Sequence, residues 1–249
     1  MRNWKPKRKS AASPRSKPGK SGSSSASTDT AEIYAFARGF ALQIQHLLNA
    51  TICNNIKITA AIAPKEPGVV IVAQGLTQTS AVGQPFPVAI RGKADVWMDL
   101  SFKFCVDPER EYPMVQSSFV GIFAADDDES CLCHFDYERE KADDYPEAHI
   151  QVYGDSAAIN HWGGELKEGG LHRLHFPAGH RRFRWTFEDV VEFMIREKIV
   201  EARPGWRKLL DDERDKFHRL QLRAAVRRDP ETAIEYLQDQ GYVITPPKK

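Results

Sequence analysis

The chain has 249 residues, 41% of them hydrophobic, which is enough for one large domain or two small ones with a substantial core. No segment approaches the roughly 18 consecutive apolar residues that a membrane-spanning helix requires, and the charged N-terminus lacks the apolar stretch of a secretion signal. We therefore expect a cytoplasmic protein without a membrane partner.

The charge is unevenly distributed along the chain. Residues 1–28 contain eight Lys or Arg and no acid, so the rest of the chain carries a formal charge of −7 although the total is +1. Apart from Trp4, this segment has almost no large apolar side chain to offset the entropy lost on ordering. We expect a basic disordered tail that either attracts RNA, DNA or an acidic partner protein, or serves only for solubility.

The four cysteines are Cys53, Cys105, Cys131 and Cys133. A chain of this length needs no disulfide framework, so we expect four reduced thiols. If residues 130–137 form a strand, Cys131 and Cys133 point into the core as small apolar side chains. His134 then points the other way, which disfavours a zinc site built from these three residues.

The first predicted helix follows the tail. Asp29 and Glu32 match a capping box, and the helix is expected to end near Cys53. Its apolar residues recur at helical spacing: Ile33, Phe36, Ala37, Phe40, Ile44, Leu47 and Leu48. An apolar stripe of this length needs a covering element, so we expect the helix to lie across the inner face of a sheet.

The sequence pattern then changes to the two-residue period of strands. The apolar runs 56–63 and 69–76 flank a Pro- and Gly-containing turn, which indicates a hairpin. Residues 95–106 show the clearest alternation in the chain, and a further strand is expected near 114–123. The acidic turn at 126–129 lacks the spacing and the glycine of a calcium loop, so we interpret it as solvated.

Three further strand-like runs each carry a histidine: 130–137, 148–153 and 171–176. Because side chains alternate between the two faces of a strand, the apolar residues of these runs can all point into one core. The opposite face would then gather one set of polar side chains, namely His134, Asp136, His149, Gln151, Arg173 and His175.

This polar face is the predicted site, and it supports two kinds of chemistry. His134, His149 and His175 could bind a divalent metal such as zinc, with Asp136 as a fourth ligand or as a partner that orients one of them. Without a metal, two of the histidines could act as general base and general acid while Arg173 holds a phosphate, as in a ribonuclease. A purely structural role in cross-strand pairing is the alternative.

The segment 179–185 interleaves cations with aromatic residues, a composition typical of single-stranded nucleic acid binding. Because it follows the third histidine run, Arg181, Arg182 and Arg184 could bind a substrate lying over the polar face, together with Gln151. In the alternative interpretation the aromatic residues only anchor the next helix.

The C-terminal part returns to a helical period. Thr186 with Asp189 predicts a helix cap, Pro204 begins a second helix, and Asp229-Pro230 begins a third. In the second helix, the residues expected to face the body are Trp206, Leu209, Leu210, Phe217 and Leu220. The same helix carries a basic stripe of Lys216, Arg219, Arg223 and Arg227, which either binds a nucleic acid or a partner or is simply solvated.

We predict an α+β fold: an antiparallel meander of six or seven strands, one long N-terminal helix on its inner face and a C-terminal helical set. The expected divisions are a basic tail (1–28), a sheet domain with the histidine site (29–202) and a helical appendage (203–249). The chain contains no P-loop, dinucleotide-binding glycine pattern, G-x-S-x-G or H-E-x-x-H motif.

Two functions follow as hypotheses. The first is a phosphodiester hydrolase of ribonuclease type, comparable to toxin-like effectors, that uses the histidine cluster. The second is a non-enzymatic module that binds nucleic acid or a protein through the basic tail and the basic helix.

Overall fold

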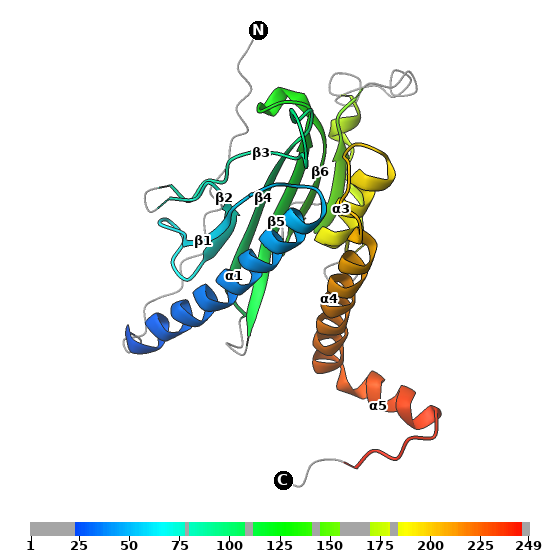
Figure 1. Ribbon diagram of the computed structural model, residues 1–249. Coiled ribbons are helices and arrows are strands. Elements are labelled where there is room, and N and C mark those ends of the chain that lie inside the picture. Colours follow the sequence, from blue (N-terminus) through cyan, green and yellow to red (C-terminus); the bar gives the residue numbers. More distant parts are fainter. Residues whose placement is uncertain are drawn as a thin grey trace.

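The computed structural model describes residues 23–77, 80–107, 112–140, 145–154, 170–179 and 184–245. Helix α1 (Ser23–Thr51) lies across an antiparallel sheet, and the helices α3 (Phe187–Arg196), α4 (Trp206–Arg228) and α5 (Pro230–Asp239) follow the sheet in the chain (Figure 1). The predicted α+β fold class is confirmed. Among the described residues, no helix is both long and apolar enough to span a bilayer.

The sheet is an antiparallel meander of eight strands in the order β1-β2-β4-β5-β6-β7-β8, with β3 paired to β4. Its long strands are β1 (Ile58–Ile62), β2 (Val70–Gln74), β4 (Trp97–Val106), β5 (Pro113–Phe123), β6 (Cys131–Glu138) and β7 (Ala148–Val152). The other two, β3 (Phe86–Pro87) and β8 (Phe176–Pro177), have only two residues each. These two short pairings account for the difference from the predicted six or seven strands.

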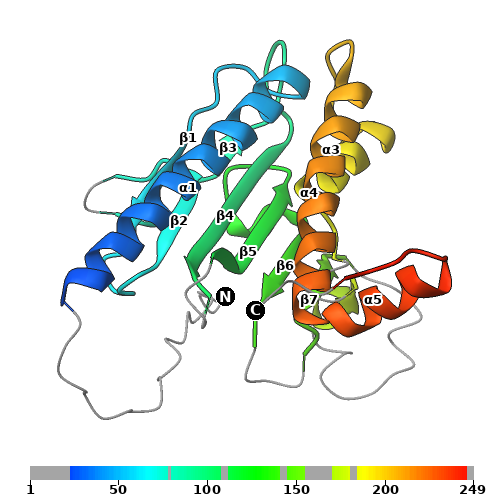
Figure 2. The ribbon, with the colours of Figure 1, turned by 90° about the horizontal axis from the view of Figure 1, so that it is seen from below.

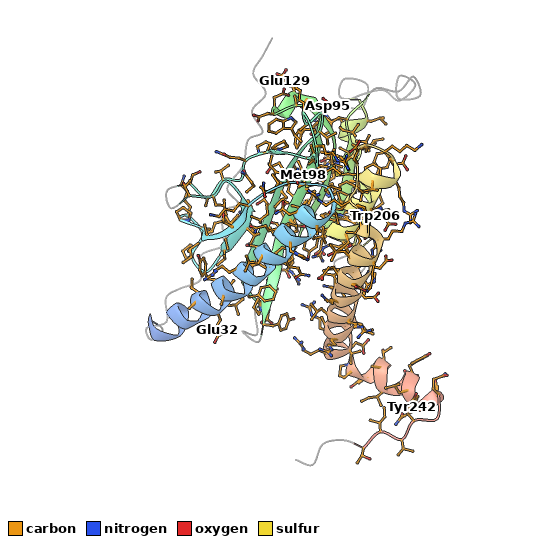
Figure 3. All side chains as sticks on the ribbon, viewed as in Figure 1. Glu32, Asp95, Met98, Glu129, Trp206 and Tyr242 are labelled. Carbon is orange, nitrogen blue, oxygen red and sulfur yellow. The ribbon has the colours of Figure 1, made fainter. Side chains whose placement is uncertain are left out.

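Helix α1 packs its apolar stripe on the sheet as predicted. Ile33, Ala37 and Leu47 are buried in the main core, and Phe40 places its ring edge-on against Phe102 and Phe104, at centroid distances of 4.9 and 5.1 Å. Figure 3 shows side chains filling the space between helix and sheet, where Met98 is fully buried.

The start of α1 differs from the prediction. The helix begins at Ser23, so residues 23–28 of the predicted tail are helical and Asp29 is not the cap. Ser, Ala and Thr in this segment tolerate a helical backbone, and the helix continues backward from a strongly anchored stripe. The rest of the predicted tail, residues 1–22, lies outside the described residues.

The two helical parts cover different halves of the sheet. Figure 2 shows α1 over β1, β2 and β4, and α4 beside β6 and β7. Helix α3 is capped by Thr186 and Asp189 in a complete capping box, as predicted. Arg214 of α4 fastens α3 by ion pairs to Asp189, at 2.8 Å, and to Glu192. The first half of α4 is thereby tied to the body.

All four cysteines are free thiols, as predicted, and Cys53, Cys131 and Cys133 are buried. Burial raises the pKa of the Cys53 thiol to about 12 and that of the Cys133 thiol to about 11. Both thiols therefore stay protonated at neutral pH, and they act as small apolar residues of the core.

Arg203, in the connection between α3 and α4, closes the C-terminus of α1. Its Nε donates to the carbonyl oxygen of Asn49 at 3.0 Å, its guanidinium to that of Cys53 at 3.1 Å, and its backbone N–H to that of Thr51 at 2.8 Å. These acceptors include final carbonyls of the helix, which have no partner within it. A cation at this end also complements the helix dipole.

Replacing Arg203 by Ala should lower the free energy of unfolding by about 2 kcal/mol, because it removes charged hydrogen bonds and leaves helix carbonyls without a partner. Urea denaturation measures this effect. Arg91→Ala, at an exposed position, is the matched control and should change stability by less than about 0.5 kcal/mol. Equal effects of the two substitutions would contradict the role assigned to Arg203.

Candidate functional site

Strands β6 and β7 place four of the predicted site residues in two cross-strand pairs. His134 is opposite Gln151, and Asp136 is opposite His149. In β6 the buried residues alternate with half-buried or exposed ones, so His134 and Asp136 lie on the face away from the helices. The predicted division of residues 130–137 between two faces is confirmed.

His134 is half-buried and hydrogen-bonded. Its Nε2 lies 2.7 Å from Oε1 of Gln151, and because a carbonyl oxygen only accepts, the Nε2 position carries the proton. Its ring lies between Phe119 and Tyr153, at centroid distances of 5.3 and 5.8 Å. Gly121 of β5 pairs with His134. Glycine has no side chain, and a Cβ added at this position would clash with the ring of Phe123 at 2.5 Å. Aromatic rings thus fill the surface beside His134.

His149 differs from the prediction, because it is buried rather than open to a substrate. Its exposed fraction is 1%. Nδ1 lies 3.0 Å from the carbonyl oxygen of Pro146, so Nδ1 carries a proton, and Nε2 lies 3.8 Å from Oδ2 of Asp136. With both ring nitrogens facing protein groups, His149 can orient its neighbours but cannot contact a ligand in solvent.

His175 extends this row of polar groups. Its ring is 4.7 Å from that of His149, in an edge-on arrangement, and 3.8 Å from that of Tyr145, on which it stacks. Asp136, His149 and His175 are therefore in successive contact. Unlike buried His149, the side chain of His175 is half-buried and partly accessible to solvent. Three of the predicted residues come together here.

The third predicted strand, 171–176, is wrong. Leu171–Arg173 forms a 3-10 turn, and only Phe176 and Pro177 pair with β7. Gly170, at a positive φ of 70°, starts the turn, and Pro177 has no N–H with which to continue a ladder. The sequence-based assignment of Phe176 to the core is wrong as well, since its side chain is 41% exposed.

The predicted cations do not gather around the histidines. Arg173 is exposed on the 3-10 turn, away from the strand position expected for it. Arg184 lies over the ring of Tyr137, 4.0 Å from its centroid, on the helix-covered face of β6. Burial there lowers the pKa of the Arg184 guanidinium to about 10. Arg181 and Arg182 lie outside the described residues.

Among the described residues, no group of three or more His, Cys, Asp or Glu side chains could hold a metal ion. The three histidines instead have other neighbours: His134 contacts Gln151, His149 contacts the Pro146 carbonyl, and His175 stacks on Tyr145. Zinc binding by His134, His149 and His175 stays a prediction.

The structure contains a second candidate surface that the sequence analysis did not predict. It is a cavity of about 570 Å³ between α1 and β1, the edge strand of the sheet. Its lining residues are Tyr34, Arg38, Ala41, Leu42, Gln45, Asn49, Asn55, Ile56, Lys57, Ile58, Thr59 and Ala60. The lining includes two basic side chains, Arg38 and Lys57, and no Asp or Glu, so the cavity is positively charged.

Side chains of α1 cover the beginning of this edge. Asn49 Nδ2 donates to the carbonyl of Ile56 at 2.8 Å and its Oδ1 accepts from the Ile56 N–H at 2.9 Å, as a neighbouring strand would do. One helical turn earlier, Gln45 Oε1 accepts from the Ile58 N–H at 3.1 Å. The four-residue spacing of Gln45 and Asn49 on one helix face is the only signal that the sequence offered.

The remainder of the edge is open. The Ala63 N–H donates to Val69, so in this antiparallel pair the odd-numbered residues of β1 bond to β2 and the even-numbered ones point outward. Among the described residues, nothing bonds to the outward backbone groups of Ala60 and Ile62. Thr59 Oγ1, beside them, is a buried atom without a hydrogen-bond partner in the described structure.

Comparisons with known proteins give no assignment for either surface. No protein-family model matches the chain, and no similar protein was found among the curated proteins or the solved structures.

Replacing His149 by Ala should lower the free energy of unfolding by about 2–4 kcal/mol, because it opens a cavity and removes the donor to the half-buried Pro146 carbonyl. His134→Ala, at a half-buried position, should cost about 1 kcal/mol. Urea denaturation gives the free energy of unfolding of each variant and of the wild type. If His149→Ala were as stable as the wild type, the side chain would not have the structural role assigned here.

Proposed function

We propose that the protein is a non-catalytic interaction module that binds an extended, acidic peptide segment as an additional strand beside β1. The observation that carries this proposal is the open backbone of Ala60 and Ile62 at the edge of a positively charged cavity. Added strands gain affinity from main-chain hydrogen bonds and specificity from the pockets that receive alternate side chains.

The cavity offers suitable contacts for such a peptide. Tyr34 and Leu42 of α1 provide an apolar wall, and Leu42 is 57% exposed in the absence of a ligand. Arg38 and Lys57, both exposed, can pair with acidic side chains of the peptide. The partner therefore combines apolar residues on one face with Asp or Glu at the positions near these cations.

Like the second hypothesis from the sequence, this function is non-enzymatic binding, but the binding surface is the β1 edge and not the basic tail or the basic helix. The basic tail and the basic stripe of α4 would select a partner only by its negative charge. A strand edge beside a charged cavity specifies the conformation of the ligand as well as its charge.

Ala60→Pro is the sharpest test, because it removes the outward N–H, which has no role in the β1–β2 ladder. Proline is tolerated on edge strands in this orientation, so the free energy of unfolding should change by less than about 1 kcal/mol. Binding of a fluorescent peptide of alternating Val and Glu, followed by anisotropy, should weaken about tenfold or more.

Ala60→Val is the matched control, since it keeps the N–H and should bind as the wild type does. A peptide of alternating Val and Lys should bind much more weakly than the acidic one, owing to Arg38 and Lys57. Equal binding of the two peptides, or full binding by Ala60→Pro, would reject the proposed site.

A second candidate function is phosphodiester hydrolysis without a metal at the histidine face. It is favoured by the successive contacts of Asp136, His149 and His175, in which buried His149 can fix the orientation of half-buried His175. His175 and His134 would be the groups that exchange protons with a substrate, since His149 is buried.

For this candidate, His175→Gln should lower the cleavage of single-stranded RNA in the presence of a chelator by about 100-fold, the usual contribution of a general acid or base. His46→Gln, at an exposed position of α1, is the matched control and should retain full activity. The candidate is rejected if the wild type does not cleave RNA, or if both variants cleave it equally.

A further inference from the structure

The C-terminal half of α4 and all of α5 form an arm, of which α5 extends beyond the sheet (Figure 1). None of the residues of α5 is buried. In Figure 3 the arm carries its side chains, with Tyr242 near its end, outside the body of the protein. A helix of ten residues has little stability in water by itself, so α5 needs a surface to pack against.

Apolar side chains line this arm and are exposed. In α4, Leu222 and Val226 are 65% and 43% exposed, and in α5, Ile234 and Leu237 are 39% and 38% exposed. Leu220 is also 59% exposed, so its predicted position against the body is wrong. Residues four apart on α4 and three apart on α5 share a helix face, so each helix presents an apolar pair.

The charges beside these apolar pairs have opposite signs on the two helices. Arg219 and Arg223 flank the pair on α4, whereas Glu231 and Glu235 flank the pair on α5. All four are exposed, and within the part of the chain that the structure describes, none of them forms an ion pair. Both sets have four-residue spacing, roughly 6 Å along a helix, so they can pair in register when the helices run antiparallel.

The arm is held at its base but not at its tip. Arg227 lies over the ring of Tyr112, 4.4 Å from the centroid, which ties the end of α4 to the body. Beyond this contact the chain turns at Asp229, whose side chain caps α5 by accepting from the Thr232 N–H at 3.1 Å. The cap fixes where α5 begins, directly after the end of α4, and the exposed apolar and acidic groups of α5 follow it.

We propose that this arm pairs with the arm of a second copy of the chain, with α4 of each protomer packed against α5 of its partner. A surface that carries both members of a complementary set can bind itself about a two-fold axis, which gives two identical α4–α5 contacts. Leu222 and Val226 then lie against Ile234 and Leu237, and Arg219 and Arg223 face Glu231 and Glu235.

Two charge-reversed variants of the full chain test this arrangement by light scattering after size-exclusion chromatography. The first carries Arg219→Glu with Arg223→Glu, and the second carries Glu231→Arg with Glu235→Arg. The wild type should have twice the mass of one chain at micromolar concentrations. Each variant alone should be monomeric, because like charges in contact raise the dissociation constant of the dimer on the order of 100-fold or more.

An equimolar mixture of the two variants should recover the dimer. At one contact the acidic α4 of the first variant meets the basic α5 of the second, and at the other the basic α4 of the second meets the acidic α5 of the first. This recovery also shows that both variants are folded. Arg91→Glu with Lys93→Glu, at exposed positions outside the arm, is the charge-matched control and should leave the wild-type mass unchanged. A monomeric wild type, dimeric single variants or a monomeric mixture would each overturn the proposal.

Discussion

The packing of α1 on the sheet is the interaction on which the rest of the structure depends. A sheet with a long apolar face is stable only when that face is covered, and α1 covers the half formed by β1, β2 and β4. The end of α1 also receives Arg203, which places the start of α4 over the other half. Both candidate surfaces follow from this arrangement, one at the edge that α1 leaves open and one on the face that no described helix covers.

Local patterns in the sequence were sufficient for most of the fold. The apolar stripe of α1, the alternation in β4 and the capping pair Thr186 and Asp189 each specify an element from neighbouring residues, and each is found in the structure. The start of α1 was missed because a helix can extend past a good cap when its residues do not oppose it. The run 171–176 was wrongly predicted to be a strand, because its alternation was too short to outweigh a turn at Gly170 and a proline at its end.

The candidate sites were harder to predict, because they depend on pairing between strands. Alternation in residues 130–137 correctly indicated the face of His134 and Asp136, but it could not show that His149 is buried beneath its neighbours. The open edge of β1 has no signal of its own, since it consists of backbone groups that every residue carries. Only strand order shows which of these groups lack a partner.

The contacts of Asn49 and Gln45 with Ile56 and Ile58 have a consequence for how the protein behaves at high concentration. A fully open edge strand invites the sheets of other molecules to join it one after another, which is how aggregates grow. Here the helix occupies the first part of the edge and leaves only a short stretch accessible. Because so little of the edge is accessible, the same two side chains that support the fold also limit the addition of strands from other molecules at this edge.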